Sequence, residues 1–304
     1  MVQSGYVEVR TVPTRLVSSG GWLQDAFVTG KDLIFIITGN PGLTSYYEEF
    51  IDLLHEETKI PVWAVSHAGH EFEDKIPCPK ENPDLYNLEG QVEHKVEFIK
   101  RYVPNDVKIH LIGHSVGSYI ILKMLKNKLI EHHVYMNYML FPAIERIGAS
   151  PNGKFFSFVN NNFLWLVVIL AGFVSCLPNA VGSALVKGYF WIEGTYQKNV
   201  PATMQLLRPT ILKNIFSLAA DEMDRILELD VDTIEKHKDK LRFYYGQVDG
   251  WCPLAYYRNL KDKVPDARAT ACTNGYRHAF VLNYSKPMAT IVGQWINETA
   301  AQSK

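Results

Sequence analysis

Residues Leu111-Ile112-Gly113-His114-Ser115-Val116-Gly117-Ser118 decide the fold of this chain. The apolar, β-branched run 107–112 before the motif predicts a strand, and the apolar residues of 119–125 after it predict a buried helix. The Gly-x-Ser-x-Gly motif therefore lies at a turn from strand to helix, which is the setting of a nucleophile elbow. The two glycines leave room for the strand and the helix to cross. Ser115 then stands at a helix N-terminus, where backbone N–H groups favour negative charge.

Strands and helices alternate on both sides of this turn. Residues 5–37 contain short strand-like runs that predict the antiparallel edge of a sheet, and the run 33–37 is apolar throughout, as in a strand buried on both faces. Further strands are predicted at 61–65, 134–141, 241–246 and 269–272, and helices at 45–54, 88–99, 215–227, 256–260 and 286–295. Ser45 and Glu48 have the spacing of a capping box. The alternation predicts an α/β fold with a doubly wound, mostly parallel sheet.

Composition narrows the class of protein. The 304 residues suffice for one large core or two modest ones, and 31 basic against 32 acidic residues argue against a nucleic-acid partner. Cys78, Cys176, Cys252 and Cys272 are widely spaced, so we interpret them as reduced thiols. The N-terminal residues lack a basic region followed by an apolar stretch, and we expect no secretory signal.

An apolar insert interrupts the predicted sheet. Between Ile147 and Ile192 there is no acidic residue, and only Lys154 and Lys187 are charged. Residues 163–177 form an apolar run that we expect to be too short to cross a bilayer as a helix, which takes about 20 residues. Residues 180–192 predict a second, weaker apolar helix. We therefore divide the chain into a first core part (1–142), an apolar helical cap or lipid-association insert (143–214) and a second core part (215–304).

Two interpretations of the insert remain open. It is either a buried helix pair of a soluble cap or a hairpin that lies in a lipid surface. The absence of acidic residues, the density of aromatic residues and the flanking lysines favour the lipid surface, because these features suit an interface with anionic headgroups. The residues that we predict to enter the lipid are Phe163, Trp165, Leu166, Ile169 and Phe173.

The chemistry predicted for Ser115 requires two partners. A serine hydroxyl needs a base to take its proton, and the base needs a carboxylate to fix its tautomer. After an elbow of this kind the chain order is serine, acid, histidine. His278 is the only histidine after His237, and it lies between the last predicted strand and the last helix. Asp249 follows the strand before that, and Glu145, after strand 134–141, is the alternative acid.

An oxyanion hole needs two preorganised N–H donors. We predict the N–H group of Val116, directly after the nucleophile, as one donor. The second should come from the loop after strand 33–37, where Gly39 allows a tight turn and Pro41 has no N–H group. Asn40 is therefore the predicted second donor.

The segment Ser66-His67-Ala68-Gly69-His70 offers two histidines three residues apart. Together with Glu71 and Glu73 they would supply ligands for a metal. We favour a structural role, with His70 packed near the floor of the active site, and expect neither a metal nor a cofactor.

The combination of motifs resembles the lipid droplet-associated serine hydrolase family. The motifs that carry the resemblance are Gly39-Asn40-Pro41-Gly42, Ser66-His67-Ala68-Gly69-His70, Gly113-His114-Ser115-Val116-Gly117, and Tyr244-Tyr245-Gly246 with Asp249-Gly250-Trp251-Cys252-Pro253. The resemblance covers most of the chain and is weakest in the insert and at both ends. It implies an α/β-hydrolase fold, a location on the cytosolic face of lipid droplets and the endoplasmic reticulum, and a serine esterase acting on neutral lipid, with sterol ester as the usual proposal.

Three other functions compete with this one. The chain would be a soluble esterase for small esters if the insert is a buried cap. It would be a droplet-bound structural protein if the triad is intact but nearly idle. It would be an acyltransferase if an alcohol, rather than water, receives the acyl group from the serine.

Overall fold

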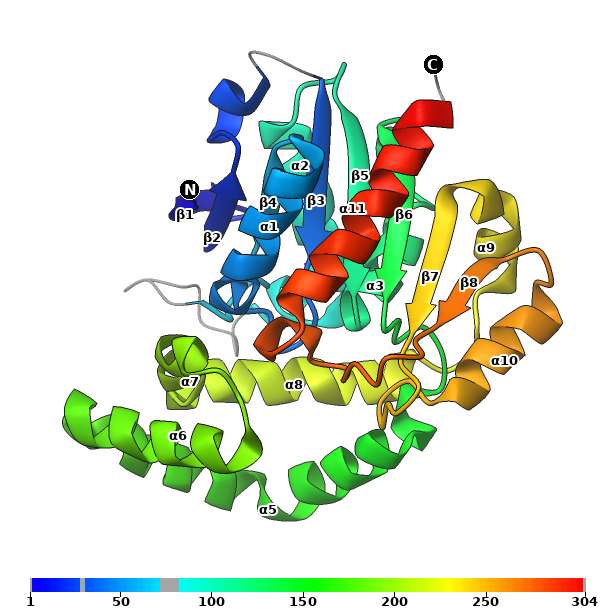
Figure 1. Ribbon diagram of the computed structural model, residues 1–304. Coiled ribbons are helices and arrows are strands. Elements are labelled where there is room, and N and C mark those ends of the chain that lie inside the picture. The colour runs from blue at the N-terminus through cyan, green and yellow to red at the C-terminus, as the bar shows by residue number, and fades with distance from the viewer. Residues whose placement is uncertain (1, 28–30, 72–81, 303–304) are drawn as a thin grey trace.

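The computed structural model describes residues 2–27, 31–71 and 82–302, and its centre is one eight-stranded sheet with the order β1-β2-β4-β3-β5-β6-β7-β8 (Figure 1). Its strands are β1 (Gln3–Val9), β2 (Val12–Ser19), β3 (Asp32–Ile37), β4 (Val62–Val65), β5 (Lys108–His114), β6 (Val134–Leu140), β7 (Leu241–Tyr245) and β8 (Arg268–Ala271). The strands β1 and β2 pair antiparallel, and β2 pairs antiparallel with β4. All pairs from β4 to β8 are parallel. The predicted sheet is thereby confirmed.

Helices cover both faces of the sheet. The helices α1 (Glu48–Thr58) and α11 (Ser285–Gln302) lie on one face, and α2 (Leu88–Tyr102) and α3 (Val116–Met124) lie on the other (Figure 1). In β3, Leu33 and Phe35 belong to the core on the α2 and α3 side, whereas Ile34 and Ile36 belong to the core on the α1 and α11 side. Side chains alternate between the faces of a strand, so an uninterrupted apolar run is what two buried faces require. Three further helices pack around the core, namely α4 (Lys128–Glu131), α9 (Val231–His237) and α10 (Leu254–Lys263).

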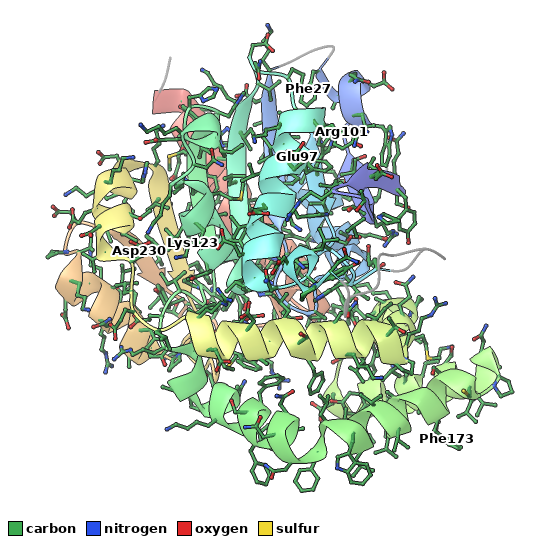
Figure 2. The ribbon with its side chains drawn as sticks, turned by 180° about the vertical axis from the view of Figure 1, so that it is seen from behind. Phe27, Glu97, Arg101, Lys123, Phe173 and Asp230 are labelled. Atoms are coloured by element: carbon green, nitrogen blue, oxygen red, sulfur yellow. The ribbon has the colours of Figure 1, made fainter. Side chains whose placement is uncertain are left out.

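The insert forms a further layer beyond the carboxyl ends of the parallel strands. The helix α8 (Pro209–Arg225) runs across these ends, and α5 (Pro151–Cys176) and α6 (Asn179–Glu193) lie on the far side of α8, beside α7 (Val200–Leu206) (Figure 1). Figure 2, from behind, shows Phe173 in this outer layer, away from the sheet. The insert is therefore placed over the edge of the sheet at which loops from several strands meet.

The first insert helix is much longer than predicted. The helix α5 has 26 residues, because Ser150 caps it by accepting a 3.0 Å hydrogen bond from the Gly153 N–H and Pro151 occupies its first turn. The expectation of a helix too short to cross a bilayer was therefore wrong. Among the described residues, α5 is the one helix that is long and apolar enough to do so by length and composition alone.

Two predicted boundaries differ from the observed elements. Ser45 does not cap a helix, because its Oγ accepts a hydrogen bond from Arg15 and its N–H donates to Glu71 at 3.4 Å. Residues Thr44–Tyr47 form a 3-10 turn, and α1 begins only at Glu48. The helix α8 runs through residue 214, so our division of the chain between residues 214 and 215 falls inside a helix.

Candidate active site

Ser115 occupies a strained turn between β5 and α3. Its backbone has φ 54° and ψ −122°, a conformation that costs a non-glycine residue on the order of 1–3 kcal/mol. A Cβ atom on Gly113 would lie 2.7 Å from Ser118 Cα, and one on Gly117 would lie 2.1 Å from the Ile37 carbonyl oxygen. Both positions therefore require glycine. The turn directs Ser115 into a cavity that Asn40 and His278 also line.

The structure brings Ser115, His278 and Asp249 together, although they are far apart in the sequence. The Ser115 Oγ lies 2.9 Å from His278 Nε2, and His278 Nδ1 lies 2.7 Å from Asp249 Oδ2. The other carboxylate oxygen, Oδ1, accepts hydrogen bonds from the N–H groups of Trp251 at 2.8 Å and Cys252 at 3.0 Å. This is the nucleophile, base and acid geometry of a serine hydrolase triad.

Asp249 is held in its ionised form. Burial acts to raise the pKa of Asp249, but the attraction of His278 and the hydrogen bonds from His278, Cys252 and Trp251 outweigh it, so that the pKa lies below its usual value. An ionised carboxylate at Nδ1 keeps the proton on that nitrogen and leaves Nε2 free to accept the proton of Ser115.

Glu145, the alternative acid, lies in a different set of contacts. Its Oε2 accepts hydrogen bonds from Asn259 Nδ2 at 2.8 Å and from Arg146 Nε at 3.0 Å. The described contacts of His278 Nδ1 involve Asp249 and not Glu145. The structure therefore places Asp249, which follows β7, beside the histidine, rather than Glu145, which follows β6.

The loop with the predicted oxyanion donor packs directly against the nucleophile. A Cβ atom on Gly39 would lie 3.0 Å from the Ser115 Cβ, which is closer than an ordinary van der Waals contact, so a larger residue here would have to displace its neighbours. The Asn40 side chain anchors the loop to α8, because its Nδ2 donates to the Ile215 carbonyl and to Glu222 Oε1, both at 3.0 Å. Val116 is the first residue of α3, directly after Ser115. Both predicted donor residues thus lie next to Ser115, Val116 directly after it in the chain and Asn40 at the same cavity.

A buried hydrogen-bond chain connects this loop to the loop of His278. The Gly39 N–H donates to Tyr47 Oη at 2.8 Å, Tyr47 Oη lies 2.6 Å from His114 Nδ1, and His114 Nε2 lies 2.9 Å from the His278 carbonyl oxygen. Burial lowers the pKa of His114 to about 3, so its imidazole is neutral. A carbonyl only accepts, so Nε2 carries the proton and Nδ1 accepts from Tyr47. The chain therefore has one direction and fixes both loops relative to Ser115.

The two histidines of the segment 66–70 are structural in their contacts. His70 Nδ1 donates to the Pro41 carbonyl at 2.6 Å, and His67 and His70 pack edge to face with ring centres 5.5 Å apart. Glu71 accepts from Thr44 Oγ1 at 2.8 Å and forms an ion pair with Arg15. Glu73 and Cys78 lie outside the described residues. Both histidines therefore contact the loop that follows β3, because the His67 N–H also donates to the Gly42 carbonyl at 3.2 Å.

One group of described residues has the spacing of a metal site, but its atoms are already used. It comprises Asp249, Cys252 and His278, with ligand atoms within 4.8 Å of one another. Asp249 and His278 are bound to each other, and the Cys252 thiol donates to the Phe141 carbonyl at 3.4 Å. Burial raises the pKa of Cys252, which keeps the thiol protonated and makes it a poor ligand.

The cavity at Ser115 is mainly apolar and has a volume of about 290 Å³. Its apolar wall is formed by Pro41, Ile147, Phe156, Leu206, Leu212, Ile215, Phe216, Ala219, Met223 and Trp251. Four of these residues lie in the insert (143–214) and four more on the remainder of α8, so the insert and α8 together complete the cavity. Such a wall suits a hydrocarbon chain or ring.

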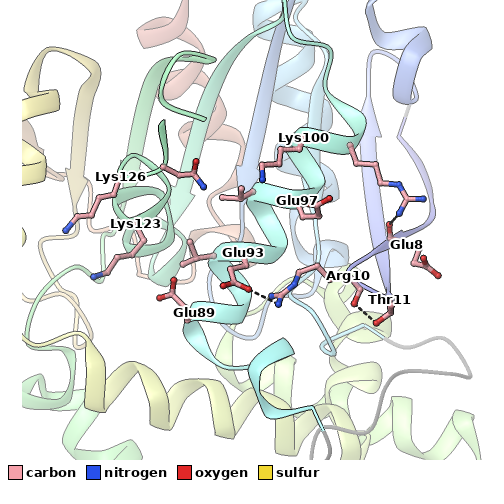
Figure 3. A pocket seen from close by; sticks show the side chains of 13 residues that line it. Glu8, Arg10, Thr11, Glu89, Glu93, Glu97, Lys100, Lys123 and Lys126 are labelled. Atoms are coloured by element: carbon pink, nitrogen blue, oxygen red, sulfur yellow. Dashed lines mark hydrogen bonds and ion pairs between the residues drawn. The ribbon is translucent and has the colours of Figure 1, made fainter. Parts of the chain in front are cut away.

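A larger hollow of about 790 Å³ has a different character. It lies between the β1–β2 turn, α2 and α3, and Figure 3 shows charged side chains of both signs around it. Arg10 and Glu93 form an ion pair there at 2.7 Å. None of the predicted site residues lines it, and its charged wall does not suit an apolar substrate.

All five predicted lipid contacts are on the surface. Phe163, Trp165, Leu166, Ile169 and Phe173 are between 37% and 65% exposed, although each is large and apolar. The neighbouring helix α6 adds Trp191 at 81% and Ile192 at 75% exposure. Only 6% of the apolar window in α5 is buried, which is not the pattern of a buried cap helix.

Sequence reasoning missed three residues of this site. Tyr47 was predicted only as part of the helix 45–54, and His114 only as part of the elbow motif. Glu222 lies in the run Asp221-Glu222-Met223-Asp224, which resembles a solvated surface. A signal was present, because Glu222 follows Ile215 by seven residues and Ala219 by three, which places it on the apolar face of the helix.

The fold is that of the α/β-hydrolases. It is similar to a haloalkane dehalogenase from Agrobacterium tumefaciens, with a TM-score of 0.67, 13% identity and coverage of 98% of this chain and 97% of that one. It is also similar to the Cif epoxide hydrolase from Acinetobacter nosocomialis, with a TM-score of 0.64, 15% identity and coverage of 96% and 88%. At these identities the similarity establishes the fold alone.

Sequence similarity identifies the family within this class. The model of the lipid-droplet associated hydrolases matches residues 30–281. The chain is 38% identical to the lipid droplet-associated hydrolase of Drosophila melanogaster, with coverage of 98% of this chain and 99% of that protein. It is 34% identical to the human protein of the same name, with coverage of 94% and 92%. The chain belongs to the lipid droplet-associated hydrolase family.

Proposed function

We propose that this protein is a serine esterase that hydrolyses neutral lipid esters at the surface of lipid droplets. The observation that carries the proposal is the chain of contacts from Ser115 through His278 to Asp249 at the wall of an apolar cavity. The names of the relatives support a lipid droplet as the location. The endoplasmic reticulum is the second proposed location, with the protein on the cytosolic face of both.

The proposed reaction has two halves. In the first, Ser115 Oγ attacks the ester carbonyl carbon while His278 Nε2 takes the hydroxyl proton. The tetrahedral intermediate collapses, the alkoxide leaves with the proton from His278, and the acyl group stays on Ser115. In the second half, His278 takes a proton from water, which attacks the acyl-serine, and the fatty acid leaves as Ser115 recovers its proton. No cofactor is needed.

The negative oxygen of each intermediate requires donors that are in place before the reaction. We assign this role to the backbone N–H groups of Val116 and Asn40. The support is positional, because Val116 begins α3 and Gly39 packs against Ser115. Anchoring of Asn40 to α8 and of Gly39 to Tyr47 would keep the loop from moving as charge develops.

The lipid surface is the proposed partner of α5 and α6. Phe156, near the start of α5, packs against Phe216 of α8 with ring centres 5.3 Å apart. Gly172, near the end of α5, faces Pro209 at the start of α8. Because α8 holds α5 at both points, we propose that α5 lies along the membrane surface and does not cross it. Its exposed aromatic face then enters the lipid monolayer.

Sterol ester is the substrate that the resemblance to the family implies. A droplet-bound protein with little activity and a soluble esterase for small esters are the alternatives. The exposed face of α5 favours the droplet over the soluble form.

Labelling with a fluorophosphonate tests the hydrolase proposal directly. We expect stoichiometric labelling of the purified protein, and peptide mapping by mass spectrometry should place the label on Ser115, because only an activated serine reacts readily with this reagent. Absence of the label in the folded protein would show that the triad is idle and would leave the structural role on droplets.

Introducing aspartates at Leu166 and Ile169 should release the protein from lipid droplets. An aspartate must either lose its water to enter the lipid or draw its segment of α5 out of the lipid, and both are costly. The amount of protein that floats with triolein droplets should therefore fall at least about tenfold. Turnover of a short soluble ester should change little. Leu227→Asp is the matched control, because Leu227 is also exposed (56%) but lies outside α5 and α6.

Thermal melts separate the two interpretations of α5. If the double variant melts normally and still floats, the anchor is not α5. If it melts at a much lower temperature and loses turnover of both the soluble ester and droplet-borne ester, α5 is part of a buried cap. Only loss of flotation with a normal melt supports the lipid surface.

A further inference from the structure

The cavity at Ser115 contains a carboxyl group that neither transfers a proton nor forms a bond to substrate in the proposed reaction. Glu222 of α8 is 4% exposed, and it lines the cavity with Asn40, Ser115 and His278. Within the described part of the chain, no lysine or arginine lines this cavity. A buried carboxylate without a cation is costly, so such a group keeps its proton.

The hydrogen bonds of Asn40 determine how this carboxyl group is oriented. Asn40 Nδ2 uses its two hydrogens on the Ile215 carbonyl and on Glu222 Oε1, both at 3.0 Å. Glu222 Oε1 is therefore an acceptor, and the proton belongs on Oε2. Burial raises the pKa of Glu222 to about 8, and the nearby Asp221 adds to this effect. The neutral acid is thus a hydrogen-bond donor in the wall of the cavity.

Asn40 supplies an acceptor beside this donor. Its Oδ1 is buried and has no hydrogen-bond partner among the described residues. The donor and the acceptor are held together by the bond between the two side chains. They form a polar pair in a wall that is otherwise mainly apolar.

A hydrocarbon that fills the cavity would leave the pair unsatisfied. Leaving one buried polar group unpaired weakens binding by about 5- to 150-fold. Sterol esters and esters of long-chain alcohols have no oxygen beyond those of the scissile ester. The carbonyl oxygen of that ester is already bound in the proposed oxyanion hole. Acylglycerols carry additional hydroxyl or ester oxygens on the carbons next to the scissile ester, and a hydroxyl group can both accept and donate.

We propose that Asn40 and Glu222 form a second polar subsite, which binds an oxygen of the alcohol part of the substrate and so selects esters of polyols, such as acylglycerols, over sterol esters. The inference rests on the proposed esterase function and ranks its substrates differently from the family resemblance. Asn40 then has two separate roles. Its backbone N–H donates to the oxyanion, and its side chain forms part of the subsite.

Two esters that differ only in their hydroxyl groups test this subsite. Monooleoylglycerol and propyl oleate have the same acyl chain and a three-carbon alcohol, and propyl oleate lacks the two free hydroxyls. In mixed micelles we expect kcat/KM of the unmutated protein to be about tenfold higher for monooleoylglycerol. Equal values for the two esters would overturn the inference without any variant.

Variants of Glu222 test whether this residue causes the preference for monooleoylglycerol over propyl oleate. Glu222→Leu should reduce the ratio of the two kcat/KM values to about one, because it removes the donor. Glu222→Gln should keep most of the ratio, because an amide N–H replaces the acid O–H and the amide oxygen still accepts from Asn40. Asp224→Asn, an exposed acid two residues away on α8, is the matched control and should leave both rates unchanged.

A structural role for Glu222 has a different signature. If Glu222 only holds Asn40 in place, Glu222→Leu will lower kcat/KM of both esters by the same factor, and the inference fails. If Glu222→Leu does not fold, Glu222→Ala replaces it in the same comparison. If the unmutated protein hydrolyses neither ester and takes no fluorophosphonate label, the proposed esterase function itself is wrong.

Discussion

Ser115→Ala should reduce ester turnover to the background rate and abolish fluorophosphonate labelling in a protein that still folds. The variant removes Oγ, the atom of Ser115 that lies 2.9 Å from His278 Nε2. Without it no acyl-enzyme forms, and loss of a triad serine costs about 10⁶-fold in turnover in a well-studied case. The elbow is otherwise retained, because alanine keeps the Cβ atom and the same backbone. The measurement is turnover of a soluble ester and of droplet-borne lipid, with thermal melts.

Ser115→Gly provides the structural control for this variant. Glycine adopts φ 54° without strain, so Ser115→Gly should melt at a higher temperature than Ser115→Ala while being equally inactive. Equal melting temperatures would show that the elbow stores no strain at this position. Full activity of Ser115→Ala would exclude a serine nucleophile for this chain.

Local patterns explain why most of the sheet was predictable. The strands β3, β5 and β7 are mostly buried on both faces, and the elbow is specified by two glycines that have no space for a side chain. The topology then limited where an acid and a histidine could lie. Asp249 and His278 were predicted for this reason, although they are distant from Ser115 in the sequence.

Contacts between distant segments explain what could not be predicted. The start of α1 depends on Arg15 and Glu71, which come from other parts of the chain and form hydrogen bonds with Ser45, so that Ser45 does not cap the helix. The start of α5 was hidden by polar residues in its first half, although Ser150 and Pro151 are good N-terminal signals. Glu222 resembled a surface acid, because its burial results from the packing of α8 over the cavity.

Asp249→Asn should lower turnover by about 10⁴-fold, as in the corresponding variant of a well-studied protease. The N–H groups of Trp251 and Cys252 both donate to Oδ1, so the asparagine oxygen must take that position. Its amide nitrogen then faces His278 Nδ1 and donates to it. Nδ1 becomes an acceptor, the proton moves to Nε2, and His278 can no longer accept the proton of Ser115.

Glu145→Gln is the matched control, since it makes the same change of acid to amide at the alternative position. Glu145 is held by Asn259 and Arg146 and has no described contact with His278, so turnover should change by less than about threefold. Burial raises the pKa of Glu145, because the charged carboxylate is costly to desolvate. A glutamine of the same shape is neutral and does not carry this desolvation cost. Kinetics on a soluble ester at neutral pH compare the two variants. A larger loss in Glu145→Gln than in Asp249→Asn would assign the acid to the end of β6, because only the residue that orients His278 can have the larger effect.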